Sequence, residues 1–275
     1  MKRLALYALA AVLGTDALVL AQPNVTSPVS AYSYEQRMGT QVPPGLTFLD
    51  ETGKEVRLGD YFGNRPIILV IVQYRCRMLC TEVLNGLVEA LRGMPGEPAD
   101  QFEVLTISFD IREKPELATE KKSNYLEAYG RPHTAAGWHF LTGNQDAIDA
   151  LTEATGFRYE YSPKQDIFAH PTGLVILTPH GRVSAYLDGI AFKPSELEER
   201  MAKAAAEGIS PPTPAYHRVL LLCYDYDPST GGYALNVMRA VRLGGIATVA
   251  VLASVIFLTW LRSRRDSRNS LMTAG

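Results

Sequence analysis

The chain has 275 residues, 47% of them hydrophobic, and a formal net charge of −2. This length suffices for one well-packed domain with additional segments at its ends. So little net charge leaves no basic field to attract nucleic acid, so we expect no nucleic-acid partner. Three cysteines are too few for the disulfide framework of a small secreted domain.

The N-terminus, residues 1–21, is typical of a secretory signal peptide. Two basic residues precede an apolar stretch from Leu4 to Leu13, and residues 19–21 offer small side chains for cleavage before Gln22. Asp16 is unusual so close to an apolar region, which leaves an uncleaved anchor as the alternative.

An extended arm and a short hairpin are expected next. Residues 22–41 are polar and hold several Tyr, Ser and Pro, which favours an extended arm. The domain itself is expected over residues 42–208. At its start, Leu46 to Leu58 contains a turn at residues 51–54, which indicates a hairpin.

An apolar strand followed by a helix forms the centre of the predicted domain. Ile67 to Gln73 is a β-branched run typical of a strand covered on both faces. Leucine and valine recur at helical spacing between Leu84 and Leu91, which predicts a helix. Cys76 and Cys80 lie at the junction between this strand and that helix.

This placement indicates that Cys76 and Cys80 work as a pair. They share a face if the helix has begun, and the start of a helix lowers the pKa of a thiol. Arg75 and Arg77 add positive charge beside them, so we expect Cys76, the first of the two, to be the more reactive. Two thiolates at this spacing either close a disulfide or hold a soft metal. Two cysteines that merely pack, or a structural disulfide, are the alternatives.

The remaining elements complete an α/β, thioredoxin-like arrangement of β-α-β followed by β-β-α. Residues 158–166 are expected to be a polar loop, and Ser195 with Glu198 has the spacing of a capping box at the start of the last helix. The predicted strands are Phe102 to Phe109, Trp138 to Leu141, Phe168 to Thr178 and Arg182 to Asp188, and the predicted helices are Lys114 to Tyr129, one from Ala147 that closes at Gly156, and one from Ser195 to near Gly208.

His170 and Asp110 are the other candidate site residues. His170 lies at the mouth of a strand that we expect beside the central one, and an imidazole added to two thiolates makes a three-coordinate site suited to Cu(I). A hydrogen-bonded loop histidine is the alternative. Asp110 ends the neighbouring strand at the same edge of the sheet, where it could orient a ligand, move a proton or cap a helix.

The C-terminal part predicts a linker, a membrane span and a basic tail. Three prolines near residue 211 open the linker, residues 209–242, in which Cys223 could be lipidated, contact a partner or be buried. Residues 243–261 carry no charge and are long enough to cross a hydrocarbon core. Four arginines in residues 262–275 place that tail in the cytoplasm by the positive-inside rule. We therefore expect an exported domain tethered to a bacterial-type cytoplasmic membrane, on its periplasmic side, by a single C-terminal transmembrane helix.

Taken together, these residues resemble the Sco/SenC family of copper-binding, thioredoxin-fold assembly factors for cytochrome c oxidase. The matching motifs are Cys76 to Cys80 after an apolar strand, Ile107 to Asp110 in the following strand, and Phe168 to His170 before a Leu-Thr-Pro-x-Gly hairpin. The resemblance spans residues 42–207.

The resemblance implies that Cys76, Cys80 and His170 bind one copper ion per domain, as Cu(I) or Cu(II). It implies delivery of that copper to the CuA centre of cytochrome c oxidase subunit II, with other periplasmic copper carriers or thiol oxidoreductases as further partners. Asp110 would then support the ligands without binding the metal.

Three departures from the family pattern leave a second hypothesis open. Arg77 stands where a proline commonly follows the first cysteine, Met78 or Leu79 replaces the acidic residue often found between the cysteines, and the main anchor is C-terminal instead of N-terminal. The charge beside the dithiol therefore differs. The second hypothesis is a thiol–disulfide oxidoreductase that keeps cysteines of the oxidase or of other exported proteins reduced. Its redox dithiol would be Cys76 and Cys80 alone, whereas copper benefits from His170 as a third ligand.

Overall fold

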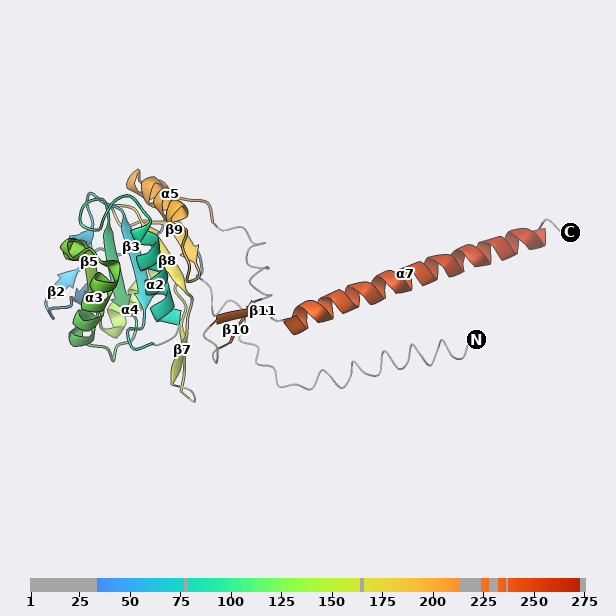
Figure 1. Ribbon diagram of the computed structural model, residues 1–275, viewed down its shortest axis with the longest axis horizontal. Coiled ribbons are helices and arrows are strands. Elements are labelled where there is room, and N and C mark those ends of the chain that lie inside the picture. The colour runs from blue at the N-terminus through green and yellow to red at the C-terminus, as the bar shows by residue number, and fades with distance from the viewer. Residues whose placement is uncertain are drawn as a thin grey trace.

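The computed structural model describes residues 34–76, 79–163, 166–212, 224–227, 232–235 and 237–272. The predicted signal peptide, most of the predicted arm, Arg77, Met78 and Cys223 lie outside the described residues. The described residues form an α/β domain and a long C-terminal helix (Figure 1).

A five-stranded sheet in the order β5-β4-β3-β8-β9 is the framework of the domain. β3, β4 and β5 are parallel to one another, whereas β8 pairs antiparallel with both β3 and β9. The strands are β3 (Ile67–Val72), β4 (Glu103–Ser108), β5 (Trp138–Leu141), β8 (Gly173–Leu177) and β9 (Val183–Asp188).

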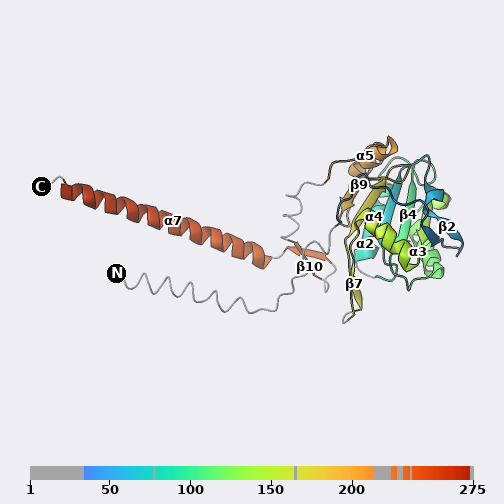
Figure 2. The same cartoon turned by 180° about the vertical axis from the view of Figure 1, so that it is seen from behind.

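Helices or a hairpin cover both faces of this sheet, and all six residues of β3 are therefore buried (Figure 2). Its even-numbered residues belong to the core cluster shared with α2 (Leu79–Arg92), α3 (Pro115–Tyr129) and α5 (Pro194–Ala205). Its odd-numbered residues pack with α4 (Gln145–Thr155) and the hairpin of β1 (Thr47–Leu49) and β2 (Glu55–Arg57). Alternate side chains of a strand point to opposite faces, so a strand covered twice needs an unbroken apolar run.

The strand directions bring three distant segments to one edge of the sheet. β3 and β4 are parallel, with Val72 opposite Ser108, so the residues that follow both strands emerge together. β8 is antiparallel to β3, so the segment that precedes β8 reaches the same edge. The turn with the cysteines, Asp110 and His170 are thus expected to meet there.

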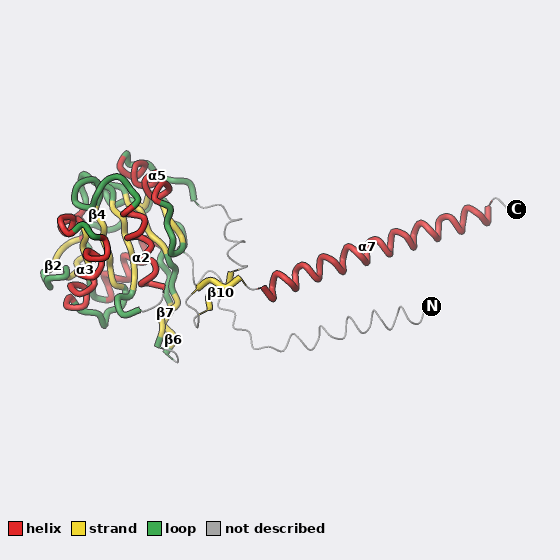
Figure 3. Tube along the Cα trace, viewed as in Figure 1, coloured by secondary structure: helices red, strands yellow, loops and turns green. Residues whose placement is uncertain are grey.

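The single strand expected from Phe168 to Thr178 is wrong, because it is two strands with a break at residues 170–172. β7 (Ile167–Ala169) pairs with β6 (Glu160–Ser162) in a hairpin outside the main sheet (Figure 3). This hairpin also replaces part of the polar loop expected at residues 158–166. Pro171 has no N–H to donate to a ladder, and Gly173 has a φ of +151° that other residues rarely adopt.

The last helix of the domain begins one residue earlier than expected and without the capping box. Lys193 is the N-cap residue, makes no side-chain cap, and is followed by Pro194 in the first helical position. Proline suits that position because its missing N–H has no partner there in any helix. Ser195 and Glu198 consequently lie inside the first turns.

The end of the predicted arm packs on the domain. Tyr34 is 3% exposed, the Glu35 N–H donates to the carbonyl of Gly156 (2.9 Å), and the Gly39 N–H donates to that of Val183 (2.8 Å).

The C-terminal helix α7 (Val237–Met272) contains one apolar stretch, Leu243–Trp260, that is long enough to cross a membrane. Its side chains are exposed, and the helix lies apart from the domain in both views (Figures 1 and 2). The other described elements are η2 (Leu58–Tyr61), η3 (Pro132–Gly137) and the paired strands β10 (Tyr224–Asp227) and β11 (Gly232–Leu235).

Candidate functional site

Cys76 and Cys80 lie in and just after the turn that joins β3 to α2. Cys80 is the second residue of α2 and is 1% exposed, whereas Cys76 precedes the helix and is half-buried. Both are in the thiol form, outside any disulfide. The Cys76 N–H donates to the Gln73 carbonyl (3.3 Å), and the Thr81 hydroxyl donates to the Cys76 carbonyl (2.8 Å). The described part of α2 runs from Leu79, and the residues between it and Cys76 lie outside the described residues.

His170 places its free ring nitrogen against Cys80. Its Nε2 lies 3.1 Å from the Cys80 Sγ, and its Nδ1 lies 2.7 Å from the carbonyl oxygen of Pro171. A carbonyl only accepts hydrogen bonds, so Nδ1 carries a hydrogen, and in the neutral ring Nε2 then presents its lone pair to the sulfur. The rings of Phe109 and Phe157 pack on the imidazole at 5.1 and 5.8 Å between centroids.

Burial is the main cause of the raised pKa of the Cys80 thiol. Removal from water raises the pKa of the Cys80 thiol well above its usual value, and a hydrogen bond with Cys76 raises it further. The N–H of Gln73, which lies 3.4 Å from the Cys80 sulfur, opposes this rise. Cys80 is thus a protonated thiol at neutral pH, and a metal that binds there must displace its proton.

Two sulfurs and one imidazole nitrogen are the donor set that Cu(I) prefers. Among the residues that the structure describes, however, no three His, Cys, Asp or Glu side chains are grouped so as to hold a metal ion. The 3.1 Å contact between the Cys80 sulfur and the His170 Nε2 brings two of these three donors together.

Asp110 lies behind the cysteines and does not cap a helix. Its buried carboxylate accepts hydrogen bonds from the Gln73 side chain (2.7 Å) and from the backbone and guanidinium of Arg112 (3.0 and 2.8 Å). The N-cap of α3 is Lys114. Burial alone raises the pKa of Asp110, but the hydrogen bonds from Arg112 and Gln73 outweigh it and hold that pKa below its usual value.

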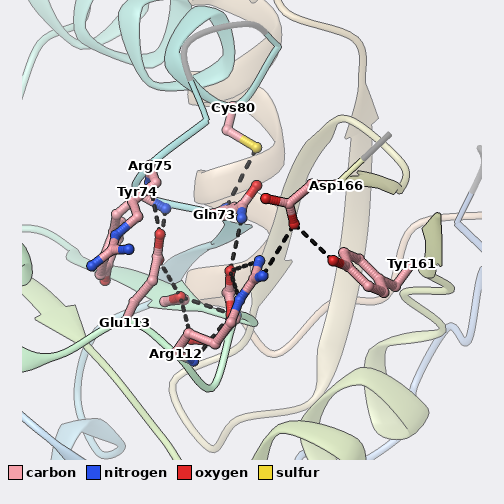
Figure 4. Close-up of polar contacts among 10 residues, drawn as sticks. Gln73, Tyr74, Arg75, Cys80, Arg112, Glu113, Tyr161 and Asp166 are labelled. Atoms are coloured by element: carbon pink, nitrogen blue, oxygen red, sulfur yellow. Dashed lines mark hydrogen bonds and ion pairs between the residues drawn. The ribbon is translucent and has the colours of Figure 1, made fainter. Parts of the chain in front are cut away.

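Glu113 is a buried residue that the sequence analysis missed. It accepts hydrogen bonds from the N–H groups of Tyr74 (2.8 Å) and Arg75 (2.7 Å) and from the Ser108 hydroxyl (2.6 Å), which fixes the turn before Cys76 (Figure 4). Burial raises the pKa of Glu113. The sequence feature that could have pointed to Glu113 is a pair of acidic residues, Asp110 and Glu113, just after a strand.

Three other histidines each pair with a glutamate. The contacts are His133 to Glu97 (2.6 Å), His139 to Glu103 (3.2 Å) and His180 to Glu207 (2.7 Å).

The sheet order, the dithiol turn after β3 and the histidine before β8 define a mixed α/β, thioredoxin-like protein of the Sco type. The SCO1/SenC family model matches residues 35–206, and the chain belongs to the SCO1/SenC family.

Solved structures show the same fold. A protein from Aquifex aeolicus VF5 with a proposed role in electron transfer is 26% identical at a TM-score of 0.54, over 62% of this chain and 95% of that one. Copper-bound ScoI of Bradyrhizobium japonicum is 22% identical (TM-score 0.45, 58% and 96%). BsSco, a member of the Sco family of cytochrome c oxidase assembly proteins, is 19% identical (TM-score 0.49, 64% and 97%). The last two likenesses are too distant to support an inference about the site. No curated protein matches the chain.

Proposed function

We propose that the protein is a membrane-tethered copper metallochaperone that assists assembly of the CuA centre of cytochrome c oxidase. Its cargo is one copper ion per domain, held by Cys76, Cys80 and His170, and its partner is subunit II of the oxidase. One observation carries this proposal: the His170 Nε2 faces the Cys80 sulfur at 3.1 Å while Nδ1 is occupied by the Pro171 carbonyl. A histidine that served only to shape the loop would not need its free nitrogen at a thiol.

The two thiols have different roles in binding and releasing copper. Cys80 is buried beside His170, so it is suited to retain the ion, whereas the half-buried Cys76 is open to an incoming ligand. Binding must release the proton of Cys80, so copper affinity rises with pH.

The location supports delivery to a membrane-bound partner. The exposed stretch Leu243–Trp260 is consistent with a membrane anchor, and the N-terminal sequence, residues 1–21, is typical of a secretory signal peptide. In this proposal the domain faces the periplasm and the basic tail lies in the cytoplasm.

Anaerobic copper titration of the full chain in detergent tests the proposal. We expect the parent to bind one copper, and His170→Ala to bind it about 10–100-fold more weakly. The control is His180→Ala, which removes an exposed histidine paired with Glu207. If His170→Ala binds copper as tightly as the parent and the control, the three-ligand site is wrong.

A thiol–disulfide oxidoreductase is the second candidate, because Cys76 and Cys80 are both in the thiol form and interact through a side-chain hydrogen bond. The Cys76 thiolate would attack a target disulfide, and Cys80 would resolve the mixed disulfide. The target gains two electrons and two protons, and the cysteines become a disulfide. This exchange needs no imidazole ligand, so reduction of a model disulfide by His170→Ala at the parent rate, with copper binding unaffected, would favour this candidate.

A further inference from the structure

The hairpin that carries His170 has little stabilisation of its own. β6 and β7 are three residues each and form a sheet separate from the main one. An isolated two-stranded hairpin is marginally stable in water. His170 follows the last residue of β7, so the orientation of this hairpin decides where the imidazole lies.

Arg112 joins this hairpin to the turn after β4. Its guanidinium binds both carboxylate oxygens of Asp110, with Nη2 at 2.7 Å from Oδ2, and reaches Asp166 through Nη1 at 3.2 Å (Figure 4). The guanidinium carbon also lies 5.5 Å from the ring centre of Tyr161 and 5.4 Å from that of Phe168. Tyr161, Asp166 and Phe168 all belong to the hairpin, and Tyr161 donates to Asp166 (2.7 Å).

The same chain of contacts continues to the cysteines. Asp110 accepts from the Gln73 side chain at 2.7 Å, and the Gln73 N–H donates to the Cys80 sulfur at 3.4 Å. One continuous series of contacts therefore runs from the hairpin through Arg112, Asp110 and Gln73 to Cys80 (Figure 4).

Arg112 links the hairpin to Asp110 through the fixed geometry of its contacts more than through the attraction between opposite charges. The Arg112–Asp166 pair alone contributes little, because the Asp166 side chain is 73% exposed. The Asp110 side chain, by contrast, is 2% exposed and held from three directions. The planar guanidinium is bound to that carboxylate and packed against two rings, which restricts it to one orientation. The ammonium group of a lysine would not be restricted in this way.

We propose that Arg112 is a positioning residue that sets the approach of His170 to Cys80 by holding the β6–β7 hairpin on the buried carboxylate of Asp110. The consequence for copper rests on the proposed function, whereas the effect on His170 does not. Phe168 also packs on Phe109 (5.3 Å between centroids), so loss of Arg112 should loosen the hairpin without unfolding the domain.

The first test needs no metal and uses the full chain in detergent. Arg112→Ala is compared with Arg112→Lys and with Arg65→Ala, which removes another half-exposed arginine, paired with Glu103 at the opposite end of β3 (2.6 Å). Hydrogen exchange of residues 160–169 and carbethoxylation of His170 are followed by mass spectrometry. We expect both to be faster in Arg112→Ala, partly restored by lysine, and at the parent rate in Arg65→Ala. Parent rates in Arg112→Ala would overturn the proposal.

The second test asks whether Arg112 acts on copper through His170. Arg112→Ala should weaken copper binding about tenfold, as loss of a residue that supports a metal ligand does. The double variant Arg112→Ala/His170→Ala should bind no more weakly than His170→Ala, because the histidine has already gone. Additive losses would overturn the positioning role. A parent that binds no copper refutes the proposed function and leaves the metal-free test to decide on Arg112.

Discussion

At the scale of single residues, burial gives the two cysteines different chemistry. Cys80 lies in the core with 1% of its surface exposed, and its raised pKa keeps it protonated at a pH where an ordinary thiol, with a pKa of about 8.5, ionises. Cys76 lies at the edge, half-buried. The same shift means that an alkaline solution deprotonates Cys80 in the unfolded chain before the folded one, so folding stability falls as the pH rises above the ordinary thiol value.

We predict that Cys76 is alkylated before Cys80 as the pH is raised. The thiolate is the reactive form, and both burial and the raised pKa withhold it at Cys80. Iodoacetamide labelling at a series of pH values, with each peptide quantified by mass spectrometry, measures the order. The denatured chain is the control, in which both cysteines should react alike. Labelling of Cys80 first in the folded chain would refute the assignment.

The sequence predicts Cys76, Cys80, His170 and Asp110 as candidates because each adjoins an apolar strand, and strand direction decides which ends meet. It does not predict the roles of Arg112 and Glu113. In the linear sequence these two lie between a predicted strand and a predicted helix, where no pattern indicates burial. Their roles depend on backbone N–H groups and side chains that only the folded turn brings within reach.

At the scale of elements, the break between β7 and β8 separates the hairpin that carries His170 from the main sheet. At its end, a Cβ on Gly173 would lie 2.3 Å from the carbonyl oxygen of Leu187. The backbone of β9 is therefore packed against a position that has room for glycine alone.

We predict that Gly173→Ala destabilises the domain by more than Gly63→Ala. Both glycines have nearly the same φ, +151° and +152°, but a Cβ at Gly63 meets nothing within 4 Å. The backbone strain is thus matched, and the difference reports the contact with β9, for which about 1–3 kcal/mol is typical of overpacking. Urea denaturation of the full chain measures both variants. Equal losses would show that β9 moves away without cost.

The main strands and helices follow from unbroken apolar runs and from apolar residues at helical spacing, which a sheet covered by helices on both faces requires. The β6–β7 hairpin could not be predicted from an apolar pattern, because it lies outside the main sheet and two of the three β6 residues are exposed. Its position is decided by contacts with Phe109 and Arg112, which are remote in sequence.

At the scale of the whole molecule, the proposed anchor would determine where the site acts. α7 is one helix of 36 residues, about 54 Å long at 1.5 Å per residue, so it exceeds a hydrocarbon core of about 30 Å. Confinement to the membrane surface raises the effective concentration of a membrane-bound partner without any new contact.

We predict that deletion of residues 243–275 releases an exported domain that binds copper but supports oxidase assembly poorly at normal expression. Copper content of the released domain and oxidase activity of the membranes are the measurements. Replacing the deleted residues by an unrelated transmembrane helix is the control, and it should restore assembly. Full assembly by the released domain would show that tethering is dispensable.

Orientation is tested by protease treatment of spheroplasts. A site near Cys76 should be cleaved from outside, and the tail from residue 262 should be protected. The reverse pattern would refute both the topology and the oxidase role that depends on it.

The antiparallel pairing of β3 with β8 has a consequence for the order of folding. Ile67 pairs with Leu177, so the chain must be present as far as β8 before His170 can reach the cysteines. Contacts this distant in sequence form slowly, whereas Cys76 and Cys80 are near neighbours in the chain. In the proposed exported protein, a newly translocated chain would therefore have both thiols before their imidazole arrives. During that period its cysteines would be open to oxidation, and the proposed copper site would be complete only when β8 joins the sheet.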